Sequence, residues 1–302
     1  MNKILLDTDI GCDIDDAVCL AYLLSKEDCK LMGITTVNGD TRARAQLASV
    51  LVKASGKSVP IYPGKKDTML IDRPRKPVPQ AAALPLMDHD DDFPESGYLE
   101  FMYRTIMDHP GEVTLLAIGP MTNVGLLFAA YPDAAENLKQ LVLMGGNFTN
   151  PLTAQGYMES NTMCDPHASA LVYRADVMRH ISIGNDVTSA LGMSRDTVYG
   201  SFRENALLRA ALPMIDVYFS SGIQTMYFHD LCAAMYIFRP EIATLSGGKV
   251  EVELTADALK GMTVLKHAAY YQPPYHQAAV SIDRNVFYEE FSAAFGSHRI
   301  DA

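Results

Sequence analysis

Residues 4–24, ILLDTDIGCDIDDAVCLAYLL, decide the fold prediction for this chain. They begin as an apolar strand and end as a helix with an apolar side. The turn between them carries five carboxylates within ten residues: Asp7, Asp9, Asp13, Asp15 and Asp16. In open α/β sheets, ligands bind just beyond the carboxyl ends of the strands. This stretch therefore predicts a strand–loop–helix unit of an α/β fold, with a ligand site at its loop.

The crowded carboxylates of this acidic loop (residues 7–16) indicate a bound cation. Like charges so close together are electrostatically costly unless a positive charge joins them. No Lys or Arg lies within the cluster, so a hard, oxygen-preferring cation such as Ca²⁺ or Mg²⁺ is the simplest candidate. A solvated, acidic helix start is the alternative, because Asp near a helix N-terminus caps the helix and suits its dipole. That alternative accounts for one or two of the five aspartates.

The rest of the chain continues the alternation of strands and helices. Apolar, β-rich runs recur at 31–37, 59–62, 112–118, 141–144 and 181–183, with helical patterns at 42–54, 98–108 and 119–131. Two late runs, 250–254 and 262–265, are expected to form a hairpin added to the sheet. Such alternation predicts an α/β fold with an open, mostly parallel central sheet flanked by helices. No repeat or low-complexity linker divides residues 1–302, so we expect one domain.

Two regions have a different character. Residues 64–97 are rich in Pro, Lys and Asp and have weak periodicity, which predicts a long surface loop. Residues 193–237 are expected to be mostly helical. The 64–97 loop, the loop at 148–164 and the helical residues 193–230 are the expected walls of a ligand pocket.

Composition narrows the partners and the compartment. The net charge of −11 argues against nucleic acid or an anionic membrane as a main partner. No signal peptide and no apolar run of membrane-spanning length is found, so a cytoplasmic protein is expected. The five cysteines are scattered without a CxxC pair, which fits reduced thiols better than disulfides or a zinc site.

Six short motifs follow one another along the chain. They are Asp7-Thr8-Asp9 with Asp15-Asp16-Ala17, Gly33–Val37, Gly119–Asn123, Val142–Gly146, Glu159-Ser160-Asn161 with Asp165-Pro166, and His229-Asp230. In their order and spacing they resemble the nucleoside hydrolase family, the inosine–uridine-preferring N-ribohydrolases, over nearly the whole chain. The resemblance implies bound Ca²⁺, a small nucleoside substrate and a homodimer or homotetramer.

The resemblance also implies roles for individual residues. The expected metal ligands are the side chains of Asp9, Asp16 and Asp230 and the backbone carbonyl of Thr122. All of these are oxygen donors, as calcium prefers. The expected substrate contacts are Asp15, Asp40, Met144, Glu159, Asn161 and His229, of which Asp15, Glu159 and Asn161 would hold the ribose hydroxyls.

The chain departs from the family pattern at three places. Ile10 stands where the family usually has Pro, and two extra residues precede the paired aspartates. Either Asp13 or Asp15 could then take the ribose role, and the match of residues 15–17 to the family's DDA favours Asp15. The family's second motif commonly continues to a Gly-Asn pair, where this chain has Gly39-Asp40. Asp40 could therefore bring another carboxylate to the sugar. The family's His-Gly pair has only His89 with Asp90 as a rough counterpart, so a base contact by His89 is not expected.

The expected chemistry is cleavage of an N-glycosidic bond through an oxocarbenium-like sugar. Asp9 would take the proton of the attacking water as general base, and His229 would protonate the leaving base. A haloacid-dehalogenase-type phosphatase using Mg²⁺ is one alternative, although Gly11 stands where that pattern wants Thr or Val. A ribose- or nucleoside-binding protein without turnover is the other alternative.

Overall fold

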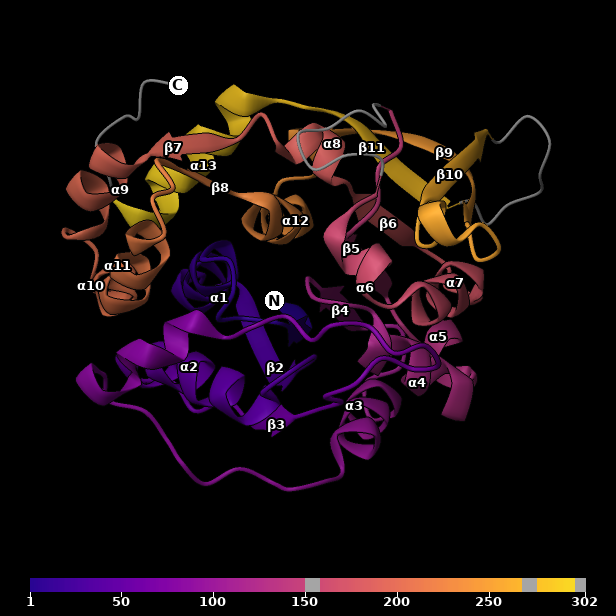
Figure 1. Cartoon of the computed structure of the whole chain (residues 1–302), viewed down its shortest axis with the longest axis horizontal. Coiled ribbons are helices and arrows are strands. Elements are labelled where there is room, and N and C mark those ends of the chain that lie inside the picture. The colour runs from indigo at the N-terminus through magenta and orange to yellow at the C-terminus, as the bar shows by residue number, and fades with distance from the viewer. Residues whose placement is uncertain (150–157, 268–275, 297–302) are drawn as a thin grey trace.

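In the computed structural model, which describes residues 1–149, 158–267 and 276–296, strand β1 (Asn2–Thr8) lies inside a nine-stranded sheet. The other strands of this sheet are β2 (Cys29–Thr36), β3 (Ile61–Pro63), β4 (Val113–Ala117), β5 (Gln140–Met144), β6 (His180–Ile183), β9 (Ala243–Val252), β10 (Thr263–His267) and β11 (His276–Ile282). Their order across the sheet is β10-β9-β11-β6-β5-β4-β1-β2-β3 (Figure 1).

The topology of the sheet places a crevice beside β1. The strands from β3 to β6, and β11 next to β6, are all parallel, whereas β9 pairs antiparallel with both β10 and β11. After β1, the chain adds β2 and then β3 on one side of β1. The next strand, β4, pairs with the other side of β1. In open α/β sheets, ligands bind where the strand order reverses in this way. The predicted α/β fold with its mostly parallel sheet is therefore confirmed, and so is the late hairpin, while β11 was not predicted.

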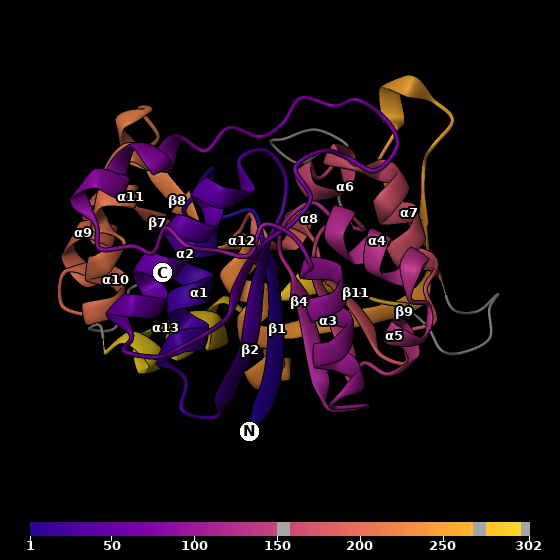
Figure 2. The same ribbon diagram turned by 90° about the horizontal axis from the view of Figure 1, so that it is seen from below.

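Helices cover both faces of the sheet. The α-helices of the described residues are α1 (Asp15–Ser25), α2 (Thr41–Ala54), α3 (Tyr98–Met107), α4 (Thr122–Ala130), α5 (Asp133–Glu136), α6 (Ser160–Cys164), α7 (Pro166–Arg174), α8 (Asn185–Thr188), α9 (Arg195–Phe202), α10 (Ala206–Ala210), α11 (Leu212–Ser220), α12 (His229–Phe238) and α13 (Arg284–Phe295). Figure 2 shows α1 and α2 on one side of β1 and β2, and α3 and α4 on the other. None of the described helices has both the length and the apolar composition needed to cross a bilayer.

The two-sided cover explains why β1 is a continuous apolar run. Ile4 and Leu6 pack into the core that includes α1, α2 and α12. Leu5 points the opposite way, into the core of α3, α4 and α7. Successive side chains of a strand alternate between the faces of a sheet, so a strand covered on both faces needs apolar residues at every position.

The two regions of different character are partly as predicted. The 64–97 region is mostly irregular but contains a 3₁₀ helix, Pro79–Leu86. The largely helical 193–237 region also contains a small two-stranded antiparallel sheet, formed by β7 (Gly192–Ser194) and β8 (Thr225–Tyr227), which the sequence did not predict. Residues 150–157 of the predicted 148–164 loop lie outside the described residues.

Candidate active site

A cleft with about 370 Å³ of free space, partly open to solvent, lies at the carboxyl edge of the sheet. We call it the acidic cleft, and it is lined by Asp9, Asp13, Asp15, Asp16, Lys76, Ile118, Met144, Glu159, Ser160, Asn161, Asn185, His229 and Asp230. Asp9 directly follows β1 and Ile118 directly follows β4, so the cleft lies at the point where the strand order reverses. The fold thus places this cleft where an α/β sheet binds its ligands.

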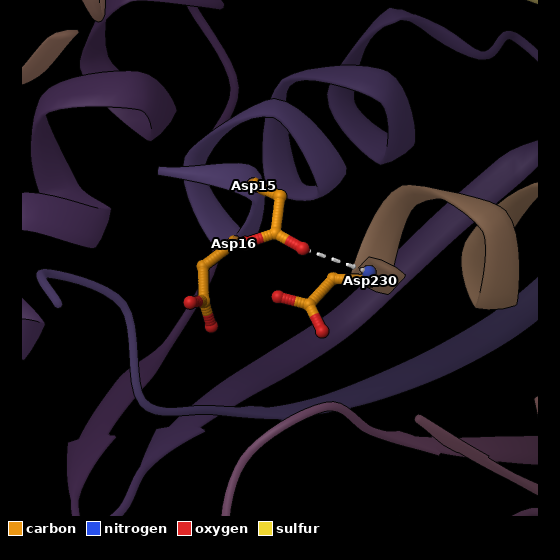
Figure 3. A group of neighbouring side chains, drawn as sticks. All are labelled: Asp15, Asp16 and Asp230. Carbon is orange, nitrogen blue, oxygen red and sulfur yellow. Dashed lines mark hydrogen bonds between the residues drawn. The ribbon is translucent and has the colours of Figure 1, made fainter. Parts of the chain in front are cut away.

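Three buried carboxylates meet in this cleft. Asp15 and Asp16 are in the first turn of α1, and Asp230 is in the first turn of α12. One oxygen from each lies within 4.8 Å of the others (Figure 3). Each of the three residues is 3–4% exposed. This carboxylate triad joins two segments that are more than 200 residues apart in the chain.

Hydrogen bonds hold two members of the triad in place. Asp15 accepts the backbone N–H groups of His229 at 3.0 Å and of Asp230 at 3.1 Å, and it thereby caps the N-terminus of α12. Asp16 accepts the hydroxyl of Thr8 at 2.5 Å. The end of β1 therefore orients the carboxylate of Asp16, and the first N–H groups of α12 orient that of Asp15.

The electrostatics of the triad fit a cation. Burial and the neighbouring Asp9 carboxylate raise the pKa of Asp15 to about 6, against the lowering effect of its backbone hydrogen bonds. Burial and the other carboxylates raise the pKa values of Asp16 and Asp230 well above the ordinary range. A divalent cation would remove this repulsion, and a donor set of carboxylate oxygens suits a hard ion. The residues present therefore fit the metal ion that the carboxylate cluster predicts.

The predicted metal ligands are only partly grouped together. Asp16 and Asp230 belong to the triad, and its third member is Asp15 rather than Asp9. Asp9 lines the same cleft but forms an ion pair with Lys76, whose Nζ lies 2.9 Å from Asp9 Oδ2. Thr122 is buried at the start of α4, and its hydroxyl donates to Asp165 Oδ2 at 2.8 Å. Thr122 is not among the residues that line the cleft.

Three of the predicted substrate contacts, Glu159, Asn161 and Met144, line the same cleft. Glu159 caps α6 by accepting the backbone N–H groups of Asn161 at 2.6 Å and Thr162 at 3.0 Å. Asn161 donates from Nδ2 to the carbonyl oxygens of Ile118 at 2.8 Å and Met144 at 3.2 Å. These bonds connect the short helix α6 to the ends of β4 and β5. Glu159, Asn161 and Met144 are thereby brought into the cleft.

The hydroxyl group of Thr188 orients the ring of His229. Its Nδ1 lies 2.7 Å from Thr188 Oγ1, and the same hydroxyl donates to the carbonyl oxygen of Gly184 at 3.0 Å. A hydroxyl that donates its one hydrogen to Gly184 accepts the next bond, which places a proton on Nδ1 and leaves Nε2 for a ligand. Burial lowers the pKa of His229, and the charges of Asp13 and Glu159 oppose this effect.

Asp40 and Asp13, two aspartates considered as contacts to the sugar, differ in their position relative to the cleft. Asp40 is exposed and caps α2 by accepting the backbone N–H of Ala43 at 3.1 Å. The structure does not bring Asp40 into the acidic cleft. Asp13 does line the cleft, and its side chain is more exposed than that of Asp15. Asp15 differs from Asp13 in that one of its oxygens is already occupied by the start of α12.

Sequence reasoning assigned no role to three polar residues of the cleft, Lys76, Ser160 and Asn185. Lys76 comes from the irregular 64–97 region, where neither periodicity nor motif marks any single residue. Asn185 follows β6, and its Nδ2 is buried without a hydrogen-bond partner among the described residues. The one available signal for Asn185 was its place directly after a strand and the glycine that follows it, at the same edge of the sheet.

Comparison with known proteins agrees with this geometry. Residues 4–289 match the family model described as inosine-uridine preferring nucleoside hydrolase. The non-specific ribonucleoside hydrolase RihC of Salmonella paratyphi C is 31% identical, over 97% of each chain. Two solved structures share the fold at 20% identity: the plant nucleoside hydrolase PpNRh1 (TM-score 0.82, 97% of this chain and 98% of that one) and the purine-preferring ribonucleoside hydrolase from Gardnerella vaginalis (TM-score 0.79, 97% and 98%). The chain therefore belongs to the inosine-uridine preferring nucleoside hydrolase family.

Proposed function

We propose that this protein hydrolyses the N-glycosidic bond of ribonucleosides with the help of Ca²⁺, releasing ribose and the free base. The observation that carries the proposal is the buried triad of Asp15, Asp16 and Asp230 in a cleft that also contains Asp9. Membership of a nucleoside hydrolase family supports the reaction class, and the relative named as a non-specific ribonucleoside hydrolase supports the substrate class. The phosphatase alternative does not agree with this family assignment.

Asp16 and Asp230 are the residues we assign to the metal. The family resemblance adds Asp9 and the backbone carbonyl of Thr122, and the triad geometry adds Asp15 as a neighbour within reach. A bound divalent cation supplies positive charge that polarises water and the sugar hydroxyls. Calcium is favoured over softer metals because every side-chain donor is a carboxylate.

Residues of the chain carry the remaining chemistry. Asp9 accepts a proton from water as the water oxygen forms a bond to the anomeric carbon of the ribose. The bond from that carbon to the base nitrogen breaks, and its electron pair leaves with the base. Asp15, Glu159 and Asn161 hold the ribose hydroxyls, since all three present hydrogen-bonding groups to the same cleft. The negative charge of the cleft favours the positive, oxocarbenium-like sugar.

His229 completes the reaction by protonating the departing base. Its Nδ1 is bonded to Thr188, so Nε2 is the nitrogen available to the substrate. Nε2 can donate a proton only from the imidazolium form, because the neutral ring already has its proton on Nδ1. The nearby charges of Asp13 and Glu159 favour this form against the effect of burial.

A nucleoside panel tests the proposal. Purified protein with Ca²⁺ should release reducing sugar from inosine or uridine, and Asp16→Asn should lose both turnover and calcium binding. Asp28→Asn is the matched control, because Asp28 is exposed and lies outside the cleft. Nucleoside binding without ribose release would instead identify a binding protein, and release of phosphate from phosphate esters would identify a phosphatase. Turnover that survives both chelation and Asp16→Asn would remove the metal from the proposal.

A further inference from the structure

Lys76 is the one strong cation in a cleft of carboxylates. Among the described residues that line the acidic cleft, it is the only lysine or arginine, and the carboxylates that line the same cleft are those of Asp9, Asp13, Asp15, Asp16, Glu159 and Asp230. Its ammonium lies 2.9 Å from Asp9 Oδ2 and 2.9 Å from Asn161 Oδ1. It thus connects the proposed general base to one of the proposed sugar-binding residues.

Hydrogen bonds with Asn38 and Arg44 hold the backbone of Lys76 in place. Asn38 Oδ1 accepts the backbone N–H of Lys76 at 2.8 Å, and Arg44 donates to its carbonyl oxygen at 3.2 Å. Arg44 is fully buried and also donates to the carbonyl oxygens of Ile10, at 2.9 Å, and Asp9. The segment that carries Lys76 is therefore tied to the acidic loop itself. Figure 2 shows this segment passing over the edge of the sheet opposite the N-terminus.

A close backbone approach supports the same conclusion. Gly39 has a φ of +68°, and a Cβ on it would lie 2.7 Å from the carbonyl oxygen of Lys76. Any other residue at position 39 would force one of these two backbone segments to move, because backbone atoms cannot give way as a flexible side chain can. Such close packing is unexpected for a surface loop, and it gives the Lys76 side chain a defined direction.

The charge state of Lys76 follows from its partners. The Lys76 side chain is partly buried, and its ammonium is paired with the Asp9 carboxylate and hydrogen-bonded to Asn161. Pairing and hydrogen bonding of this kind stabilise a charge that is partly removed from water. Two of its three N–H groups bond Asp9 and Asn161, which leaves one for the interior of the cleft.

We propose, on the basis of the nucleoside hydrolase function above, that Lys76 is a positioning residue for the reaction. By holding Oδ2 of Asp9, the ammonium turns Oδ1 toward water, so that one oxygen is anchored and the other accepts the proton. By holding Oδ1 of Asn161, it also fixes that side chain at the sugar. Lys76 repels a cation in the carboxylate triad, so its presence costs metal affinity while it improves the geometry of catalysis.

This trade-off gives opposite effects on two measurable quantities. Lys76→Met keeps the length of the side chain but removes its charge. It should lower kcat about 100-fold, the scale of loss expected when a reacting group is misplaced by about 1 Å. KM should change much less. Ca²⁺ should bind to the metal-free variant about ten-fold more tightly, because a repelling charge has been removed.

The experiment compares wild type, Lys76→Met, Lys76→Arg and Lys66→Met. Ribose release at saturating Ca²⁺ gives kcat and KM, calorimetry on metal-free protein gives the calcium Kd, and thermal unfolding reports the fold. Lys76→Arg keeps the charge and should recover part of kcat with a calcium Kd near that of wild type. Lys66→Met alters an exposed lysine close by in the same region and should match wild type throughout.

A lowered kcat with retained or tighter calcium binding supports the inference. Unchanged kcat overturns it, and so does a parallel loss of kcat, calcium affinity and thermal stability, which would show a merely structural tie. Should Lys76→Met fail to fold, Lys76→Gln is judged by the same criteria, and failure of both to fold also overturns the inference. Absence of ribose release by wild type refutes the proposed function, whereas wild-type turnover with a fully active Lys76→Met refutes only the role of Lys76.

Discussion

The leaving-group step depends on one side chain, His229, and on the hydroxyl behind it. Thr188 bonds Nδ1 and thereby sets both the tilt of the ring and the nitrogen that meets the substrate. Tyr227 stacks on the ring at 5.9 Å between centroids, which restricts the ring further. A histidine ring held by these two contacts presents Nε2 in a defined direction, which suits proton transfer from Nε2 to the leaving base.

This geometry predicts a substrate-dependent effect of His229→Ala. An acid helps only when negative charge builds up on the departing atom, so kcat on inosine should fall by about 100-fold to 10,000-fold. A nitrophenyl riboside, whose leaving group needs no proton, should be hydrolysed within a few-fold of the wild-type rate. Steady-state kinetics on both substrates measures the contrast. Equal losses on both, with calcium still bound, would show that His229 serves packing rather than proton transfer.

At the scale of elements, helices α4 and α7 approach each other unusually closely on one face of the sheet. Gly125 of α4 faces Ala168 of α7, and a Cβ on Gly125 would lie 2.9 Å from both the Cα and the Cβ of Ala168. Real Cβ atoms do not come so near to backbone atoms, so one of the helices would have to move. The contact matters for the site because α4 begins at Thr122 and α7 follows directly after α6.

Gly125→Ala should therefore destabilise the protein by about 1–3 kcal/mol, as overpacking in a core does. Gly200→Ala is the matched control, because Gly200 lies within helix α9 with no atom within 4 Å of its added Cβ. It should stabilise the protein by up to about 1 kcal/mol through helix propensity. Urea unfolding of both variants gives the two free energies. A destabilised Gly200→Ala, or a Gly125→Ala as stable as wild type, would contradict this account of the packing.

Over the whole molecule, buried carboxylates make stability depend on pH and on calcium. Burial raises the pKa of Asp7 from its ordinary value of 3.8 to about 7, although hydrogen bonds from Thr35 and Asn123 oppose the rise. A carboxyl with a raised pKa binds its proton more tightly in the folded state than in the unfolded state. Its contribution to stability is complete below about pH 4 and is lost as the pH rises through the folded pKa. The carboxylate triad adds to the same trend.

The metal-free protein should therefore lose stability between about pH 4 and pH 8, as measured by urea unfolding at each pH. Saturating Ca²⁺ should flatten this profile, because it binds the folded state and favours ionised triad carboxylates. Asp7→Asn should flatten it further, with or without calcium, by removing about 4 kcal/mol of ionisation cost above pH 7. Asp7 Oδ2 has no partner among the described residues, so the amide loses no hydrogen bond there. A rising metal-free profile would contradict this prediction.

Much of the fold could be predicted because its signals are local. Apolar runs of strand length alternate with helical patterns, and an Asp followed by Pro, as at residues 165 and 166, is a typical local start of a helix, which α7 shows. The acidic loop predicted a cation site, since five carboxylates in ten residues are costly without a common positive partner. The strand β11 and the pair of β7 with β8 were missed because strands are defined by the neighbours they pair with, and pairing is not visible in one segment.

The sequence by itself determined the α/β fold, the family and the acidic loop, since each of these resides in contiguous residues and their order. Only the tertiary structure decided which side chains share the cleft. It brought Asp230 to Asp15 and Asp16, left Asp40 outside as a helix cap, and placed Lys76 between Asp9 and Asn161. The direction of a side chain depends on the packing of distant elements and on long-range hydrogen bonds, and no local pattern encodes these.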